Sequence, residues 1–395
     1  MMRCCLRGCE APDIDGFMAR VEVAVAPDAA AGAAAAGGEE TVVVWAAEGM
    51  ALHVGCWAAV VVAQSMRGQM GTAERRLMKQ AASTVEKFDA AEELAAKAAR
   101  AAELLQAAAG SAIAFTGAGI STAAGLGDYR GKQGKWTLES WGLGAGDSGY
   151  TTEYEALRPT YAHEAVAELV RRGTLCYVVS QNADGLHALS GIPSAQLSDV
   201  HGSAFTEYCR DGCGARYVRD CYCPEDRAEA LFAGKLAGPK PPHIRKCRGC
   251  GSNHWTGRSC EACGAALHDT VISFGDGLED CVLGPAFEKA EAAGCCLSLG
   301  STMSIGPSNA VVEMGHGPLV VCVRQDTEMD GHVATSGGVR AHGDCDPFMA
   351  LLMRSLLGEV ACDAWEATLA GRKAGYDRLR PTAGKRRGDI FVMKT

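Results

Sequence analysis

The sequence predicts an α/β protein whose main domain is a Rossmann-like, doubly wound parallel sheet, interrupted by a small cysteine-rich module. Short, continuous apolar runs followed by polar or turn residues are typical of buried parallel strands. Here they alternate with segments of helical spacing, as in sheets covered by helices on both faces. Between the second and third runs the alternation stops and cysteines cluster, which indicates an insertion. The four runs are 111–115, 175–180, 295–299 and 319–323.

The composition narrows the class of protein. A chain of 395 residues, 48% of them hydrophobic, is long enough for one large α/β domain and one or two small modules. Its net charge of −9 argues against binding nucleic acid mainly through phosphate contacts, and favours a basic polypeptide as partner. The most apolar run, around 56–63, is too short to span a membrane, so we expect a soluble protein.

The chain divides into five segments. Residues 1–70 form an N-terminal extension that contains cysteines and an Ala/Gly-rich interruption. Residues 71–207 start with one or two predicted helices and contain the first part of the large domain. The cysteine-rich module occupies 208–267, the second part of the large domain 268–358, and a C-terminal tail 359–395.

A glycine-containing turn follows the first apolar run. In Thr116-Gly117-Ala118-Gly119 the missing side chains allow backbone N–H groups to approach a phosphate, and we expect a helix to begin there. An ordinary tight turn has the same composition, so this motif alone is weak. The acidic residue that a dehydrogenase places about 20 positions further on is missing, which disfavours a hydride-transfer enzyme.

Amide, carboxylate and imidazole groups follow the second apolar run. Gln181, Asn182 and Asp184 lie just past a strand end, where open α/β sheets contact ligands. His201 precedes a glycine shortly afterwards. Taken separately, these are a capping turn and a hydrogen-bonded core histidine. Together with the glycine turn they indicate a nucleotide site with a base beside it, because an imidazole titrates near neutral pH.

The cysteines predict a zinc-binding module. No secretory signal is recognisable, so we expect a reducing compartment, where paired cysteines more often bind zinc than form disulfides. Four thiolates would close the coordination sphere and make the metal structural. The favoured set is Cys209, Cys213, Cys260 and Cys263. Further candidates are Cys221, Cys223, Cys247 and Cys250, which could bind a second zinc, replace one pair or be spare thiols, and the N-terminal set Cys5, Cys9, His53 and Cys56.

Five motifs follow one another along the chain: Gly117-Ala118-Gly119-Ile120-Ser121, Asp128-Tyr129-Arg130-Gly131, Gln181-Asn182-Ala183-Asp184, His201-Gly202 and Gly300-Ser301-Thr302. These motifs and their order resemble those of the sirtuins, NAD-dependent protein lysine deacylases. The resemblance covers about 89–358. Segments 180–187, 256–260 and 267–275 look most like the nuclear class IV branch.

The resemblance implies an NAD-binding domain joined to a zinc module, with acyl-lysine and NAD entering the cleft between them from opposite sides. It implies that the acyl oxygen attacks the nicotinamide ribose, nicotinamide leaves, and His201 helps a ribose hydroxyl attack the resulting imidate. Asn182 and Asp184 would line the nicotinamide and ribose pocket. The remaining cofactor contacts would be Gly117, Ala118, Gly119, Ile120, Ser121, Asp128, Tyr129, Arg130, Gln181, Gly300, Ser301, Thr302 and Cys345. The substrate backbone would pair with Val271, Ile272, Phe274 and Gly275.

On this resemblance we expect NAD-dependent removal of acetyl or other acyl groups from protein lysines, with histones among the candidate substrates. The products would be nicotinamide, the free lysine and O-acyl-ADP-ribose. Two alternatives stay open: mono-ADP-ribosylation of a protein side chain in the same pocket, and a non-catalytic chromatin adaptor that senses NAD. The class IV likeness and the basic cluster 385–387 favour a nuclear over a cytoplasmic location.

The chain departs from the family pattern at four points, one of which is an extra Pro- and Cys-containing stretch in the zinc module, about 221–255. Tyr129 stands where phenylalanine is usual, and Cys209 and Cys213 are one residue wider apart than usual. The asparagine usual after the strand near Val320 is missing, with Val323 or a neighbour in its place. This last change leaves one ribose hydrogen bond without its usual partner.

Overall fold

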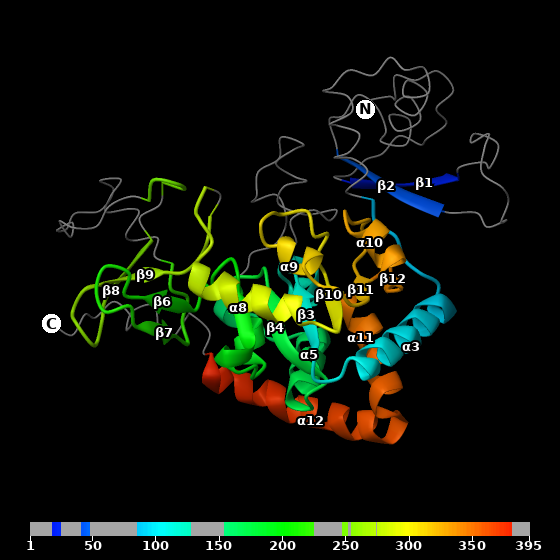
Figure 1. Cartoon of the computed structure of the whole chain (residues 1–395). Helices are drawn as coiled ribbons and strands as arrows, with labels where there is room; N and C mark the ends of the chain where they lie inside the picture. The colour runs from blue at the N-terminus through cyan, green and yellow to red at the C-terminus, as the bar shows by residue number, and fades with distance from the viewer. Residues whose placement is uncertain are drawn as a thin grey trace, which may run out of the picture.

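The computed structural model describes residues 18–24, 41–47, 85–127, 154–224, 247–251, 254–273 and 275–380. At its centre is a six-stranded, fully parallel sheet of order β12-β11-β10-β3-β4-β5 (Figure 1). The strands are β3 (Ala112–Thr116), β4 (Leu175–Ser180), β5 (Leu197–Asp199), β10 (Cys295–Leu299), β11 (Leu319–Cys322) and β12 (Val339–Ala341). The doubly wound sheet predicted from the sequence is therefore confirmed.

Helices cover both faces of this sheet. One core packs α3 (Ala91–Ala107), α5 (Tyr161–Arg171), α11 (Cys345–Leu357) and α12 (Glu359–Leu379) against one face. The other core packs α8 (Asp280–Glu291), α9 (Ala310–Glu313) and α10 (Asp330–Thr335) against the opposite face. Successive residues of β3 alternate between the cores, Ala114 in the first and Phe115 in the second. Because both faces are buried, these strands read as continuous apolar runs.

The strand order places a topological switch point between β3 and β10. From β3 the chain moves outward through β4 and β5, and then returns to the other side through β10, β11 and β12. In such sheets the loops after two adjacent central strands diverge and leave a crevice at the carboxyl ends of the strands. The fold therefore positions a site beyond the ends of β3 and β10.

A second, antiparallel sheet of order β7-β6-β9-β8 lies beside the large one (Figure 1). Its strands are β6 (Thr206–Tyr208), β7 (Arg216–Val218), β8 (Trp255–Ser259) and β9 (Ala266–Asp269). Cys209, Cys260 and Leu267 form its small core. So little apolar surface leaves this module short of stabilisation of its own, which makes a metal a natural complement.

The C-terminal region differs from the expected tail. Residues 359–379 form the 21-residue helix α12, which buries Cys362, Trp365 and Tyr376. Because this helix contains few large apolar residues, its sequence is typical of a solvent-exposed segment. The burial of these three side chains becomes apparent only in the folded structure. In Figure 1, α12 runs along the base of the large sheet towards the small one.

The remaining elements are short, apart from the N-terminal hairpin. β1 (Met18–Ala24) pairs antiparallel with β2 (Thr41–Ala47). α6 spans Leu186–Leu189, and 3-10 turns occupy Ala118–Ile120, Thr122–Ala124, Tyr154–Ala156 and Ser194–Gln196. None of the helices described combines the length and apolar character that crossing a bilayer demands. The candidate ligands Cys5, Cys9, His53 and Cys56 and the predicted contacts Asp128, Tyr129, Arg130 and Phe274 lie outside the described residues.

Candidate active site and metal centre

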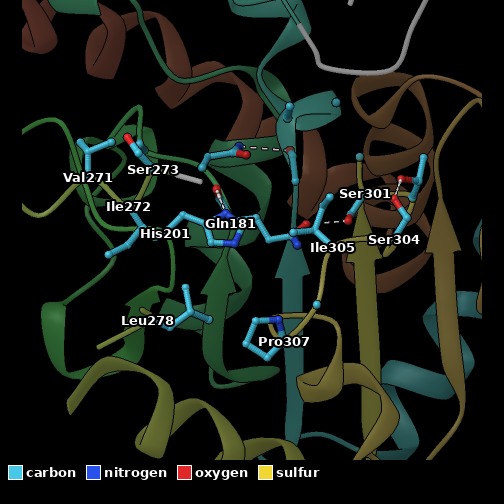
Figure 2. Close-up of a pocket in the computed structure, with 18 of the residues that line it drawn as sticks. Gln181, His201, Val271, Ile272, Ser273, Leu278, Ser301, Ser304, Ile305 and Pro307 are labelled. Atoms are coloured by element: carbon cyan, nitrogen blue, oxygen red, sulfur yellow. Dashed lines mark hydrogen bonds between the residues drawn. The ribbon is translucent and has the colours of Figure 1, made fainter. Parts of the chain in front are cut away.

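A cavity of about 570 Å³ lies beyond the carboxyl ends of β3, β4 and β10, at the switch point of the sheet. This volume falls within the range typical of small-molecule and cofactor sites. Figure 2 shows His201 and Gln181 between the segment Val271–Ser273 on one side and Ser301 and Ile305 on the other. The lining includes predicted residues Gly117, Ala118, Gly119, Gln181, Asn182, His201, Val271, Ile272, Gly275, Gly300, Ser301 and Thr302.

Three glycines allow the loops after β3 and β10 to pack against each other. A Cβ on Gly117 would lie 2.8 Å from the Gly300 carbonyl oxygen, and one on Gly119 would lie 2.7 Å from Gly300 Cα. Gly300 has a φ of +67°, and its Cβ would meet the Ile120 nitrogen at 2.3 Å. The Gly119 N–H donates to the Gly300 carbonyl. The glycines are thus required by loop packing, and the helix expected after them is replaced by two 3-10 turns, Ala118–Ile120 and Thr122–Ala124.

The amide and carboxylate predicted after β4 form a buried hydrogen-bonded group with Ser121. The Asn182 side-chain amide donates to the Gly117 carbonyl at 3.1 Å and to Ser121 Oγ at 3.2 Å. Ser121 Oγ donates to Asp184 Oδ2 at 2.7 Å, and the Leu186 N–H donates to Asp184 Oδ1 at 2.9 Å. Both Asp184 oxygens are therefore engaged inside the protein, and Asp184 is not among the cavity-lining residues. Its carboxylate orients Asn182, which does line the cavity.

The ring of His201 is held in one tautomer. Its Nδ1 lies 2.9 Å from the Gln181 carbonyl oxygen, which can only accept, so Nδ1 is the protonated nitrogen. Burial lowers the pKa of His201 below its ordinary value. The imidazole is consequently neutral at physiological pH, and Nε2 keeps its lone pair. This arrangement suits a general base acting on a ligand in the cavity.

Hydrogen bonds fix the loop after β10 against the end of β4. Ser301 Oγ donates to Gln181 Oε1 at 2.7 Å, and Gln181 Nε2 donates to Ser308 Oγ at 2.7 Å. The Met303 N–H also donates to Ser301 Oγ. Gln181 thus bridges two loops on either side of the switch point, and its backbone carbonyl orients His201.

The segment predicted to bind substrate forms one wall of the cavity. The Ile272 N–H donates to the His201 carbonyl at 2.9 Å, which couples this wall to the imidazole. Gly202 has a φ of +74°, and a Cβ there would lie 1.6 Å from the Thr270 carbonyl oxygen. Only glycine permits this approach. The wall residues 271–273 and 275 are not part of any strand.

Four thiols converge beside the small sheet. The sulfurs of Cys209, Cys213, Cys260 and Cys263 all lie within 4.8 Å of one another, with Cys209 to Cys263 at 3.4 Å and Cys213 to Cys260 at 3.5 Å. The Tyr217 hydroxyl lies 3.3 Å from Cys260 Sγ and lowers the pKa of that thiol to about 6. Four sulfurs at these separations suit a tetrahedral zinc, whose ligand-to-ligand distances follow from Zn–S bonds of about 2.3 Å.

Four described residues that were predicted to contact the cofactor do not line the cavity: Ile120, Ser121, Asp184 and Cys345. Ile120 is buried in the core with α11, and Cys345 is buried at the start of α11. Conversely, several residues that line the cavity could not be recognised from the sequence, among them Ser304, Ile305, Pro307 and Gln325. They carry no periodic or motif signal, because their role depends on the path of the loop after β10.

The strand order and the position of the cavity define the class: an α/β protein of the dinucleotide-binding type with a thiolate metal module. Comparison with known proteins identifies the family. The pattern of the Sir2 family matches residues 149–307. The NAD-dependent protein deacetylase Sirt6 of Drosophila melanogaster is 33% identical over 249 residues, covering 62% of this chain and 72% of that protein. The chain therefore belongs to the Sir2 family, the sirtuins.

Two further relatives agree with this assignment. The NAD-dependent protein deacetylase SRT1 of Arabidopsis thaliana is 36% identical over 247 residues, covering 62% of this chain and 46% of that protein. The NAD-dependent protein deacetylase sirtuin-7 of Homo sapiens is 33% identical over 268 residues, covering 64% of this chain and 59% of that protein. The chain thus spans about half the length of these two relatives. The likeness to Sirt6 and sirtuin-7 is consistent with the class IV branch inferred from the sequence.

Proposed function

We propose that the protein removes acetyl or other acyl groups from protein lysine side chains in an NAD-dependent reaction. The products are nicotinamide, the free lysine and O-acyl-ADP-ribose. One observation carries this proposal: the neutral imidazole of His201, in a fixed tautomer, lines a cavity at the switch point of a dinucleotide-binding sheet. The relatives named NAD-dependent protein deacetylase support it.

The cavity fits a dinucleotide. Gly117, Gly119 and Ser301 bring backbone close to the position where a phosphate meets the end of a central strand. Gln325 also lines the cavity, is 3% exposed, and has a side-chain nitrogen without an acceptor among the described residues. Val323 also lines the cavity, and Val323 or a neighbour stands where the family usually has asparagine. We propose that the Gln325 amide supplies the hydrogen bond to the bound nucleotide that Val323 cannot make.

In this proposal the protein positions the bound reactants and provides one proton acceptor. When bound, NAD would supply the ribose that takes up the acyl group, with nicotinamide as leaving group and one solvent water consumed as the lysine amine is released. Asn182, held by Ser121 and Asp184, orients the nicotinamide end of the pocket. His201 Nε2 accepts a proton from a ribose hydroxyl. General-base catalysis of this kind accelerates a reaction by about 10²–10⁴-fold. The four thiolates of the small sheet serve stability, because a closed sphere leaves no position for water.

The acyl-lysine segment approaches the wall that contains Val271, Ile272 and Gly275. An extended peptide there would bind mainly through its main chain, which reads little of the substrate sequence. The net charge of −9 favours basic substrate segments, as histone tails are. A nuclear location is part of this proposal, supported by the class IV likeness and by the basic cluster 385–387.

The test compares the wild type with His201→Ala and a control, His316→Gln, an exposed histidine on another loop. Each is incubated with an acetyl-lysine peptide and NAD, and the products are identified by mass spectrometry. We expect deacetylated peptide and O-acetyl-ADP-ribose from the wild type and control, and a loss of at least about 100-fold in kcat for His201→Ala, with NAD binding retained. Full activity of His201→Ala would refute the role of the imidazole. A mass gain of one ADP-ribose on the protein, without deacetylation of the peptide, would instead support the alternative function, mono-ADP-ribosylation.

A further inference from the structure

A second group of metal-binding side chains lies between the small sheet and the rim of the cavity. Its members are Cys247, Cys250, His254 and Asp276, and their ligand atoms all lie within 4.8 Å of one another. Cys247 Sγ is 2.8 Å from Asp276 Oδ1, and Cys250 Sγ is 3.1 Å from His254 Nε2. His254 Nε2 is 3.4 Å from Asp276 Oδ2. Two sulfurs, one imidazole nitrogen and one carboxylate oxygen form a donor set suited to zinc.

The imidazole of His254 is oriented as metal-binding histidines usually are. Its other nitrogen, Nδ1, lies 3.2 Å from Asp269 Oδ1. A carboxylate that accepts from the second ring nitrogen fixes the tautomer and directs the first nitrogen to the metal. His254 also has a φ of +55°, a conformation rare for residues other than glycine. Such strain is typical of sites where the surrounding structure holds a residue in place for a function.

The turn that contains Cys247 and Cys250 repeats the backbone of the turn in the first thiol group. In that group the Gly264 N–H donates to the Cys260 carbonyl at 2.8 Å, and Gly264 has a φ of +74°. In the second, the Gly251 N–H donates to the Cys247 carbonyl at 3.1 Å, and Gly251 has a φ of +79°. The Gly249 N–H also points to Cys247 Sγ at 3.3 Å, as expected for a donor to a thiolate.

From this geometry we propose a second structural zinc site, formed by Cys247, Cys250, His254 and Asp276. Four protein ligands close its coordination sphere, so this metal has no open position for catalysis. Cys221 and Cys223 are not part of it. Both are buried and neither belongs to any group of metal-binding side chains among the described residues. Of the alternatives that the cysteine pairs leave open, the structure selects Cys247 and Cys250 as ligands and the other two as buried thiols.

The second site connects the inserted module to the substrate wall. Asp276 lines the cavity, and its Oδ2 accepts from the Ser273 N–H at 3.0 Å. The backbones also meet, since a Cβ on Gly249 would lie 2.0 Å from the Gly275 carbonyl oxygen. Ligation of Asp276 therefore holds the end of this wall in place. The metal links a cysteine pair of the insertion to a loop 26 positions further along the chain, from 250 to 276.

The metal content of the full-length chain tests the proposal, and its outcome does not depend on deacylation. Zinc per chain is measured by inductively coupled plasma mass spectrometry for the wild type, Cys250→Ser and Asp276→Asn, with Cys223→Ser as the matched control. We expect each ligand variant to hold about one equivalent less than the wild type. The control is expected to keep the full content. Equal zinc in all four proteins would overturn the proposal, whatever the total.

A second measurement needs no substitution. The native wild type is treated with N-ethylmaleimide, with and without a zinc chelator, and the labelled cysteines are identified by peptide mass spectrometry. We expect Cys247 and Cys250 to be protected until the chelator is added, because a metal-bound thiolate reacts slowly. Cys281, an exposed thiol, should be labelled under both conditions. Labelling of Cys247 and Cys250 at the rate of Cys281 before chelation, or their recovery as a disulfide, would contradict the site.

Discussion

Two buried histidines should make the protein sensitive to mild acid. His163 and His187 are 0% and 2% exposed, and their rings lie 4.8 Å apart behind the active site. Burial is the main cause that lowers the pKa of each to about 3. His163 Nδ1 also accepts from the Thr160 N–H in the cap of α5, and His187 Nε2 lies 2.8 Å from Thr116 Oγ1. Protonating His163 at Nδ1 would break that cap.

The sign follows from the difference between the folded and unfolded states. An unfolded histidine has a pKa of about 6.5, so on acidification the unfolded state binds protons that the folded state does not. The stability that the two neutral rings contribute is present in full above that value and is lost as the pH falls towards their folded pKa of about 3. Between about pH 7.5 and pH 5.5 each ring lowers the free energy of unfolding by about 1 kcal/mol, so that both together lower it by about 2–3 kcal/mol.

The assay is urea unfolding at the two pH values, followed by tryptophan fluorescence, for the wild type and His187→Gln. Loss of zinc in acid affects both proteins alike, so the informative quantity is the difference between their pH dependences. We expect the drop in unfolding free energy to be smaller by about 1 kcal/mol in His187→Gln. His316→Gln, an exposed substitution, is expected to keep the wild-type drop. An identical drop in wild type and His187→Gln would refute the reasoning.

Three further predictions concern the site and its supports. Gly202→Ala forces a Cβ to within 1.6 Å of a carbonyl oxygen and should lower the free energy of unfolding by at least about 3 kcal/mol. The control Gly191→Ala places its Cβ 3.9 Å from the nearest neighbouring side-chain atom and should cost only the positive-φ strain of about 1–2 kcal/mol. Thermal unfolding distinguishes the two variants, and equal costs would count against the contact at Gly202. Cys260→Ser should lower both the zinc content and the melting temperature, and a variant that keeps its metal would argue against that ligand. The buried Arg380 guanidinium donates to two backbone carbonyls at 3.1 and 3.0 Å beside the active site. Arg380→Met should therefore lower the free energy of unfolding by about 2–4 kcal/mol and raise the KM for NAD, whereas Arg378→Met, at an exposed position, should change neither quantity. An unchanged KM would show that Arg380 serves stability alone.

Features that depend on neighbours in the chain were predictable from the sequence. The apolar runs predicted as strands form β3, β4, β10 and β11. These strands are buried on both faces, so consecutive residues in each are apolar and the run is visible in the sequence. Two strands of the large sheet, β5 and β12, were missed because each has only three residues, too few to show a pattern. The helix α12 was missed for the opposite reason, since its length is ample but its buried residues are sparse.

The site shows the same division. Gly117, Asn182 and His201 could be proposed from the sequence, because each stands next to a strand end or a turn with a recognisable composition. The roles of Asp184 and Gln181 could not, because each depends on a partner far along the chain: Ser121 for Asp184, and Ser301 for Gln181. A sequence contains no signal for which distant hydroxyl will reach a given carboxylate.

The family, the parallel sheet and the paired cysteines could be recognised in the sequence, because local composition and the order of motifs encode them. Which groups share a site depends on the folded chain. It brought His254 and Asp276 to the thiols of Cys247 and Cys250, and it placed the wall at 271–275 beside the imidazole of His201. The physical reason is that metal ligation and hydrogen bonding act over about 2–4 Å, and folding alone sets distances of that size between residues far apart in the chain.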